Sequence, residues 1–237
     1  MKIQASILFD IDGTLLFARG VGRGAFAAAF RAAYGVDYPD IGGISFVGAT
    51  DSGVVRQMAA RCGVPNSPAR EEHFFFQLAC HLDAAMDAKP SQIFPGVPEL
   101  LRELTRRDYR LGLVTGNIRA TAWSKVRHAH VDDCFSFGAY GDESEDRNEI
   151  ARLALGRAPA GYAPRLLVGD TPRDIEAAHR NGLAALAVGT GWVALDDLRR
   201  SGADAVIQDF SDTERTISLM ESVLEQTTIQ QPTRNRP

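Results

Sequence analysis

Short apolar runs alternate with helix-like segments along most of the chain. Runs typical of buried parallel strands fall at residues 7–9, 110–115, 134–137, 165–169, 183–188 and 205–207. Apolar residues recur at helical spacing between them, at residues 99–107, 121–130, 146–156, 172–181, 195–201 and 211–225. Strands that alternate with helices in this way predict βαβ units. We therefore expect an α/β fold, a Rossmann-like parallel sheet with helices on both faces.

Residues 16–90 interrupt this alternation after the first strand. They contain no convincing strand, and their helical patterns lie at residues 25–34, 53–61 and 68–87. Aromatic residues such as Phe74 recur at helical spacing, which is typical of a core. The sequence thus predicts an all-α domain at 16–90, inserted into an α/β core of residues 1–15 and 91–226. Residues 227–237 are rich in Gln, Thr, Asn, Arg and Pro and predict a disordered tail.

The composition is that of a globular chain. With 237 residues, 45% hydrophobic and 24% charged, it can form one large domain or a core with a smaller insert. A net charge of −4 and a pI near 5.7 argue against a broad nucleic-acid surface. The chain has three cysteines, an odd number, and they lie far apart in the sequence (Cys62, Cys80 and Cys134). This pattern disfavours a disulfide framework. Apolar runs are too short for a membrane span or a signal peptide. We expect a cytoplasmic protein with no nucleic-acid or membrane partner.

Two carboxylates, Asp10 and Asp12, follow the first predicted strand and precede Gly13 and Thr14. Strands disfavour Asp, and burial disfavours charge. Unit charges about 4 Å apart at an effective dielectric near 20 repel by about 4 kcal/mol, so the pair requires a cation or a shared proton. Taken alone, the pair also fits an ordinary turn or helix cap, since Asp-Gly is a turn signal.

Polar residues also follow other predicted strands. They are Thr115-Gly116-Asn117, the loop at 141–147, and Gly169-Asp170-Thr171 with Asp174. The carboxyl ends of strands in an open parallel sheet face one crevice, where ligands bind. Several carboxylates directed into one crevice form a cation site of the kind that Mg²⁺ prefers. Pro172 begins a helix that places Asp174 one turn on, back toward Asp170. The Thr115 segment is equally compatible with a site that binds phosphate oxygens and with an ordinary turn at the end of a strand.

Three of these segments resemble, in order, signatures of the haloacid dehalogenase superfamily. They are D-I-D-G-T-L from Asp10, V-T-G-N around Thr115, and G-D-T-P-R-D around Asp170. Members of this superfamily are mostly phosphatases that use an aspartate nucleophile and Mg²⁺. The insert at 16–90 lies where the family often carries a small helical cap. The resemblance therefore implies that the predicted all-α domain is a cap over the crevice.

The resemblance also implies roles for single residues. Asp10 would be the nucleophile that forms an aspartyl-phosphate, and Asp12 would protonate the leaving alkoxide and later activate water. Thr115 would hold phosphoryl oxygens. Asp170 would bind Mg²⁺ beside Asp10 and the backbone carbonyl of Asp12, and Asp174 would support the metal or orient the basic residue. Dehalogenases of this type lack an acid at the position of Asp12, so phosphate-ester chemistry is favoured.

The third signature departs from the commonest form. Phosphoglycolate-phosphatase-like members usually carry Lys-Pro in this region, but no lysine lies between Lys125 and the C-terminus. Arg147, at a predicted helix start, is the better candidate for the phosphoryl-stabilising cation, since an arginine stays protonated and can pair with two oxygens. Lys125 is the alternative, and its position is otherwise interpreted as a charge on a helix surface. The missing Lys-Pro weakens the case for phosphoglycolate itself as substrate.

These observations predict a Mg²⁺-dependent hydrolase of small phosphate monoesters. A phosphomutase on the same scaffold and a non-catalytic phosphate-binding module are the alternatives. The substrate would be a small phosphorylated metabolite, and the protein a monomer or homodimer. Besides Gly116 and Asn117, polar residues at loop ends of the insert are candidates for substrate contact; they are Arg19, Arg23, Thr50 and Asp51. Asp51 or Ser52 is also expected to cap the helix at 53–61.

Overall fold

The computed structural model describes residues 4–18, 20–37, 39 and 41–230. Within this part of the chain, a six-stranded sheet has the order β5-β4-β1-β6-β7-β8, and every neighbouring pair is parallel. The strands are β1 (Ser6–Phe9), β4 (Arg110–Val114), β5 (Phe135–Ala139), β6 (Pro164–Gly169), β7 (Ala184–Val188) and β8 (Ala205–Ile207). Strand β1 lies between β4 and β6, with Ile7 paired to Leu111 and Leu166. The predicted parallel α/β sheet is confirmed, and its strand order reverses beside β1.

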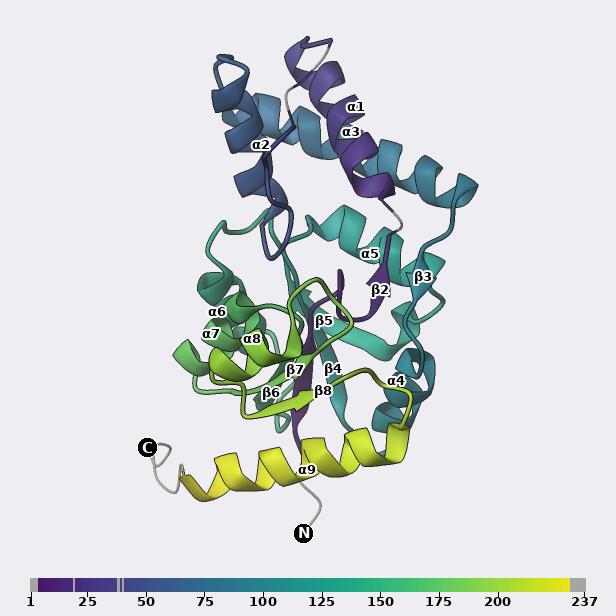
Figure 1. Cartoon of the computed structure of the whole chain (residues 1–237), viewed down its shortest axis with the longest axis vertical. Helices are drawn as coiled ribbons and strands as arrows, with labels where there is room; N and C mark the ends of the chain where they lie inside the picture. The colour runs from purple at the N-terminus through teal and green to yellow at the C-terminus, as the bar shows by residue number, and fades with distance from the viewer. Residues whose placement is uncertain (1–3, 19, 38, 40, 231–237) are drawn as a thin grey trace.

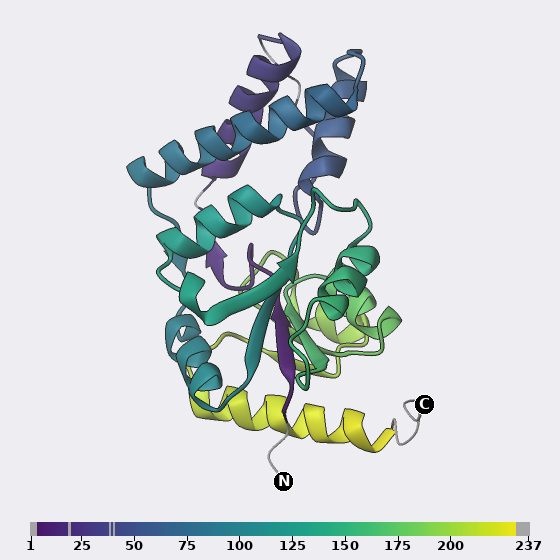
Figure 2. The same ribbon diagram turned by 180° about the vertical axis from the view of Figure 1, so that it is seen from behind.

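Helices cover both faces of this sheet (Figure 1 and Figure 2). They are α4 (Val97–Arg106), α5 (Arg119–His128), α6 (Arg147–Gly156), α7 (Pro172–Arg180), α8 (Leu195–Arg200) and α9 (Thr213–Gln230), with a short 3-10 helix at Asp132–Cys134. Helices α4, α5 and α9 share one hydrophobic cluster, and α6, α7 and α8 share another. The sheet therefore buries both of its faces, as continuous apolar strands require.

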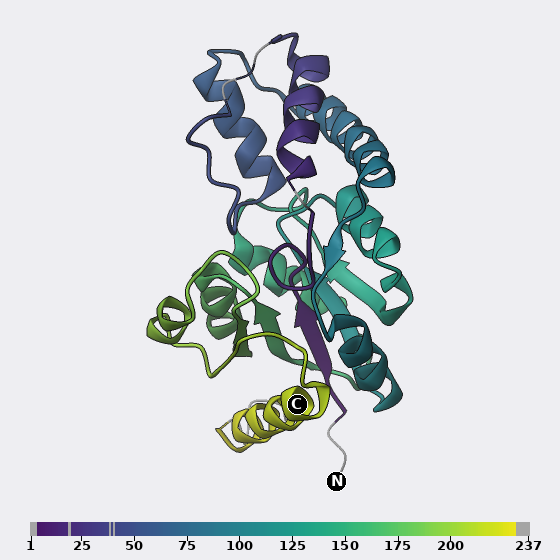
Figure 3. The same cartoon turned by 45° about the vertical axis from the view of Figure 1, so that its right-hand side comes forward.

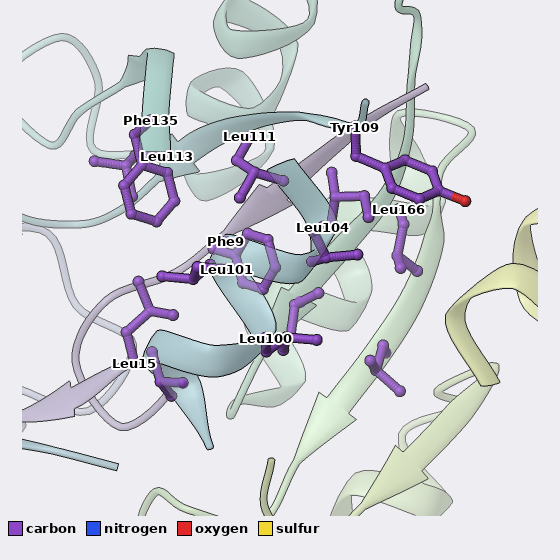
Figure 4. Close-up of a cluster of buried hydrophobic side chains, with 14 of the residues drawn as sticks. Phe9, Leu15, Leu100, Leu101, Leu104, Tyr109, Leu111, Leu113, Phe135 and Leu166 are labelled. Carbon is purple, nitrogen blue, oxygen red and sulfur yellow. The ribbon is translucent and has the colours of Figure 1, made fainter. Parts of the chain in front are cut away.

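The side chains of β1 show how the two faces are built. Ile7 and Phe9 belong to the cluster under α4, and Leu8 belongs to the cluster on the opposite face. Figure 4 shows Phe9 of the first cluster among leucines of α4 and the neighbouring strands. Successive strand residues point to opposite faces, so a strand that is apolar at every position must be covered on both. Burying each such side chain contributes about 1.5–3 kcal/mol.

Three further helices lie beyond the carboxyl ends of the strands (Figure 1 and Figure 3). They are α1 (Val21–Tyr34), α2 (Asp51–Arg61) and α3 (Pro68–Ala88), and we call them the helical unit. Their apolar faces form a separate hydrophobic cluster. Phe74 lies at its centre, with ring centroids 5.5 Å from Phe26, 6.4 Å from Phe30 and 6.5 Å from Tyr34. Phe74 and the aromatic residues around it therefore form a core, as their spacing indicated, whereas Phe76 is 65% exposed.

A two-stranded antiparallel sheet joins the two chain segments that enter and leave the helical unit. Strand β2 (Leu16–Phe17) pairs with β3 (Gln92–Ile93), with Leu16 opposite Ile93. The prediction of no strand in 16–90 is therefore wrong at β2. A strand of two residues is too short to show a two-residue period, so no sequence pattern reveals it.

Some helix ends also differ from the prediction. The cap of α2 is Thr50, whose hydroxyl accepts a hydrogen bond from the Gly53 amide, whereas Asp51 and Ser52 lie inside the helix. Helix α9 continues to Gln230, so residues 227–230 extend a helix where a disordered tail was expected. A helix that is already formed adds residues at little cost, which explains the extension. Residues 231–237 of that tail lie outside the described part of the chain.

Among the described helices, none is both long and apolar enough to cross a membrane.

Candidate active site

Three buried carboxylates meet at the carboxyl edge of the sheet. Asp10 follows β1, Asp170 follows the neighbouring β6, and Asp174 lies in the first turn of α7. One oxygen from each lies within 4.8 Å of the others. The strand order therefore brings together residues that are up to 164 positions apart, at the edge where ligands bind in such sheets.

Local structure holds Asp174 and Asp170 in place. Pro172 begins α7, and the backbone amide and hydroxyl of Thr171 both donate to Asp174 Oδ2, at 3.1 and 2.7 Å. The hydroxyl of Thr14 donates to Asp170 Oδ1 at 3.2 Å. Gly13 has a φ of +83°, and a Cβ there would lie 2.3 Å from Asp170 Oδ2. The glycine of D-I-D-G-T-L is thus required both by its backbone angle and by the close approach of Asp170.

The acidic cluster has an unbalanced charge. Burial raises the pKa of Asp170, and the negative charges of Asp10 and Asp174 raise it further. Burial likewise raises the pKa of Asp10, although the charge of Arg147 opposes this effect. Among the described side chains in contact here, three carboxylates face one guanidinium, a net charge of −2 when all are ionised. A divalent cation fits this site, because it would neutralise the excess charge and accept carboxylate oxygens.

Arg147 supplies the positive charge inside the cluster. It is the first residue of α6, after Asp146, which caps that helix by accepting from the Asn148 amide at 2.9 Å. Its Nη2 lies 2.8 Å from Asp10 Oδ1 and 2.6 Å from Asp174 Oδ1. Burial alone would lower the pKa of Arg147, but the two carboxylates raise it above its ordinary value. The structure thus places Arg147, rather than Lys125, beside Asp10.

Asp12 lies apart from the three clustered carboxylates. Its side chain pairs with Lys125, whose Nζ lies 2.7 Å from Oδ1 and 2.6 Å from Oδ2. Asn117 Nδ2 donates to Asp12 Oδ2 and to the Thr115 hydroxyl, both at 2.7 Å. The predicted carboxyl-edge residues Thr115 and Asn117 are therefore linked to Asp12. A metal-binding role for the backbone carbonyl of Asp12 stays a prediction.

Lys125 is buried, and its interpretation as a helix-surface charge is wrong. Only 8% of its side chain is exposed. It lies on the inner face of α5 with Ala122 and Val126, three residues before and one after it. This spacing on the apolar stripe is a sequence signal that a lysine points inward. The identity of its partner, 113 positions away, has no such signal.

The helical unit contacts this edge through the start of α2. The Asp51 amide donates to the Gly116 carbonyl at 2.7 Å, and Asp51 Oδ2 accepts from the Ile118 amide at 2.9 Å. The Thr121 hydroxyl donates to the same oxygen at 3.4 Å. Burial raises the pKa of Asp51 to about 6. Asp51 thus supplies the first turn of α5 with an acceptor that its own cap residue, Ile118, lacks.

Two side-chain hydrogen bonds and one close backbone approach add to this contact between the helical unit and the sheet edge. Arg173 Nη1 donates to the Gly48 carbonyl at 2.8 Å, and the Ser52 hydroxyl donates to the Gly141 carbonyl. A Cβ at Gly116 would lie 2.1 Å from the Ala49 carbonyl oxygen. The glycine of V-T-G-N therefore leaves room for the segment that leads into α2.

Arg23 has contacts within the helical unit. Its guanidinium donates to the carbonyls of Ile41 and Ile44, at 3.4 and 3.1 Å, and lies over the Phe46 ring at 4.5 Å. Its predicted contact with substrate stays a prediction, as does that of Thr50. Arg19 lies outside the described residues.

The fold and site define a class of protein, and comparison with known proteins identifies it. A family model described as haloacid dehalogenase-like hydrolase matches residues 7–188. The chain belongs to this family. The resemblance to the phosphatases of the haloacid dehalogenase superfamily is thus confirmed, as is the prediction that the chain is an enzyme of the hydrolase class.

Several curated relatives span most of the chain, and two of them show the range of their activities. One is a 5'-nucleotidase of Pseudomonas aeruginosa, 29% identical over 200 residues that cover 82% of this chain and 86% of the relative. The other is a phosphoglycolate phosphatase of Synechococcus elongatus, 27% identical over 210 residues that cover 87% and 94%. Among solved structures, CbbY from Rhodobacter sphaeroides in complex with phosphate has a TM-score of 0.70 at 24% identity, covering 89% of this chain and 96% of that one. This likeness shows a shared fold.

Proposed function

We propose that this protein hydrolyses small phosphate monoesters with Mg²⁺, through an aspartyl-phosphate on Asp10. One observation carries the proposal. Asp10, Asp170 and Asp174 are buried together at the carboxyl edge of the sheet, and among the described residues the only cation paired there is Arg147, which binds Asp10 and Asp174. Such a site fits a divalent cation and then a substrate that is itself an anion.

The residues of the site account for the reaction in two steps. In the first, an oxygen of Asp10 attacks phosphorus, the ester P–O bond breaks, and Asp12 donates a proton to the leaving oxygen. In the second, Asp12 takes a proton from water, which attacks phosphorus and releases Asp10 and inorganic phosphate. Arg147 holds Asp10 at one oxygen and leaves the other for the attack. Asp10, Asp170 and Asp174 would hold the Mg²⁺, which supplies positive charge for the phosphoryl oxygens.

The helical unit is proposed to act as a cap that sets the size of the substrate. Residues 16–90 would form this cap, on a core of residues 1–15 and 91–226. The cap proposal is supported by the contact between Asp51 and the sheet edge. Asp51 and the segment before it contact the backbone of Gly116 and Ile118, next to Thr115. The relatives named 5'-nucleotidase and phosphoglycolate phosphatase suggest small phosphorylated metabolites as substrates. A cytoplasmic location stays a prediction.

Hydrolysis of p-nitrophenyl phosphate, with and without Mg²⁺, tests the proposal. We expect Asp10→Asn to lower turnover by at least about a thousandfold, because a carboxamide cannot replace the nucleophile. The matched control is Asp196→Asn, on an aspartate whose side chain is 75% exposed on α8, and it should keep wild-type turnover. A chelator should abolish activity, and added Mg²⁺ should restore it. Activity that survives Asp10→Asn or chelation would contradict the proposal.

A phosphate-release screen over a metabolite panel would then name the substrate class. Phosphoglycolate and 5'-nucleotides belong in that panel because they are the substrates that the relatives' names print. A phosphomutase would release little inorganic phosphate from a sugar phosphate, so the same screen separates that alternative from a hydrolase.

A further inference from the structure

The carboxylate of Asp12 is held by more donors than its predicted chemistry requires. Lys125 Nζ contacts both of its oxygens, and Asn117 Nδ2 contacts Oδ2 as a second donor. Yet 44% of the Asp12 side chain is exposed, so water could solvate this carboxylate without any ion pair. Burying a lysine to bind a half-exposed carboxylate costs desolvation of the ammonium. The arrangement therefore indicates a demand on the orientation of Asp12.

The contacts of Lys125 account for its whole donor capacity. An ammonium has three N–H donors and no acceptor. Its three contacts are the two oxygens of Asp12 and Asn117 Oδ1, the last at 2.6 Å. Asn117 in turn donates to the Thr115 hydroxyl. Lys125 thus has no donor left for a phosphoryl oxygen, and the cation beside Asp10 is Arg147.

We propose that Lys125 is a positioning residue, which acts with Asn117 to orient Asp12 toward the leaving oxygen of the substrate. Asp12 Oδ2 accepts from both donors, whereas Oδ1 accepts from Lys125 alone, so Oδ1 is the freer oxygen for proton exchange. This inference rests on the proposed function. In the step concerned, a bond forms between an Asp10 oxygen and phosphorus, the ester P–O bond breaks, and the ester oxygen receives the proton that Asp12 took from water in the preceding turnover. Lys125 keeps its own protons throughout.

Substrates whose leaving groups differ in basicity isolate this role. Phenolate needs a proton as it leaves, whereas p-nitrophenolate is a stable anion and needs it far less. The value of kcat/KM reports the step that breaks the ester bond, so a misplaced Asp12 should penalise phenyl phosphate selectively. General acid catalysis contributes about 10²–10⁴-fold, and a displacement of about 1 Å can cost about 10²-fold.

The experiment measures kcat/KM of Lys125→Met on both aryl phosphates with Mg²⁺ present. We expect a fall of about 10- to 100-fold for phenyl phosphate and of less than about threefold for p-nitrophenyl phosphate. In an Asp12→Asn background, Lys125→Met should add no further selective loss. The matched control is Arg127→Met, which removes a charge from an exposed position of the same helix and should leave both values unchanged.

Several outcomes would overturn the proposal. Equal losses on both esters would assign Lys125 to phosphoryl binding or to folding, and no loss on either would remove it from the reaction. A selective loss that persists in the Asp12→Asn background would show that it does not act through Asp12. If Lys125→Met does not fold, Lys125→Gln decides by the same comparison, because it removes the ammonium but keeps a polar side chain next to Asp12 and Asn117. Wild-type protein inactive on both esters would instead contradict the proposed function.

Discussion

Replacement of Asp51 by asparagine should make the stability of this protein less dependent on pH. Asp51 is buried where the helical unit meets α5, and its carboxylate accepts hydrogen bonds from Ile118 and Thr121. Burial raises its pKa from the ordinary 3.8 to about 6, although Lys125 opposes the effect. Asparagine has nearly the same shape and keeps one acceptor oxygen, so Asp51→Asn removes chiefly the charge.

The sign and size of the effect follow from linkage. A raised pKa means that the folded state binds the proton more tightly than the unfolded state, so stability is lost as pH rises from about 4 through about 6. At about 1.4 kcal/mol per pKa unit, the ionised Asp51 costs about 3 kcal/mol at a pH well above 6. Part of this cost is already present at pH 5. From pH 5 to pH 8, the free energy of unfolding of the variant should therefore rise by about 1–2 kcal/mol relative to that of the wild type.

Urea unfolding at several pH values between 5 and 8, followed by circular dichroism, measures this difference. A chelator in all samples keeps metal binding from adding its own pH dependence. Asp196→Asn, at an exposed position, serves as the control and should give a curve parallel to the wild type. The reasoning is refuted if the curves of Asp51→Asn and wild type are also parallel, because Asp51 would then titrate alike in the folded and unfolded states.

Three further substitutions test the site and the core. Arg147→Met should destabilise the protein by about 3–5 kcal/mol, because it leaves the carboxylates of its partners, such as Asp174, buried without their cation. In thermal melts, Mg²⁺ should raise the Tm of this variant more than that of the wild type. An equal rise would contradict the inference that Arg147 offsets part of the negative charge of the cluster. Gly13→Ala should abolish both phosphatase activity and stabilisation by Mg²⁺, since its Cβ would displace Asp170. Calorimetric titration with Mg²⁺ checks this, and unchanged affinity would count against the site. Phe74→Ala should lower the free energy of unfolding by about 3–5 kcal/mol in urea, whereas the same change at Phe76, which is 65% exposed, should cost little.

Much of the site followed from local patterns in the sequence. Apolar runs predicted the strands, and polar residues at their ends included Asp10, Asp170 and Arg147. In a parallel sheet all carboxyl ends lie at one edge, so residues far apart in the chain could be expected in one crevice. In the structure, Arg147 Nη2 lies 2.8 Å from Asp10 Oδ1, and an oxygen of Asp170 lies within 4.8 Å of one of Asp10. The resemblance of the motifs to the haloacid dehalogenase superfamily predicted a chemical role for each of these residues.

Other features depended on contacts that no local pattern encodes. The spacing on α5 is typical of an inward-facing position for Lys125, but only the tertiary structure decided that Lys125 binds Asp12. Asp51 was expected at a helix start, yet it supplies an acceptor to a different helix, α5, 67 positions away. Strand β2 is too short to show a period, and it exists because β3 lies opposite.

The sequence by itself determined the α/β sheet, the helical character of the insert and the acidic edge, because each follows from periodicity or from the direction of parallel strands. The tertiary structure decided which cation serves which carboxylate, with Arg147 on Asp10 and Lys125 on Asp12. Ion pairs form between whichever side chains the packing brings within about 3 Å, and packing depends on the whole chain at once.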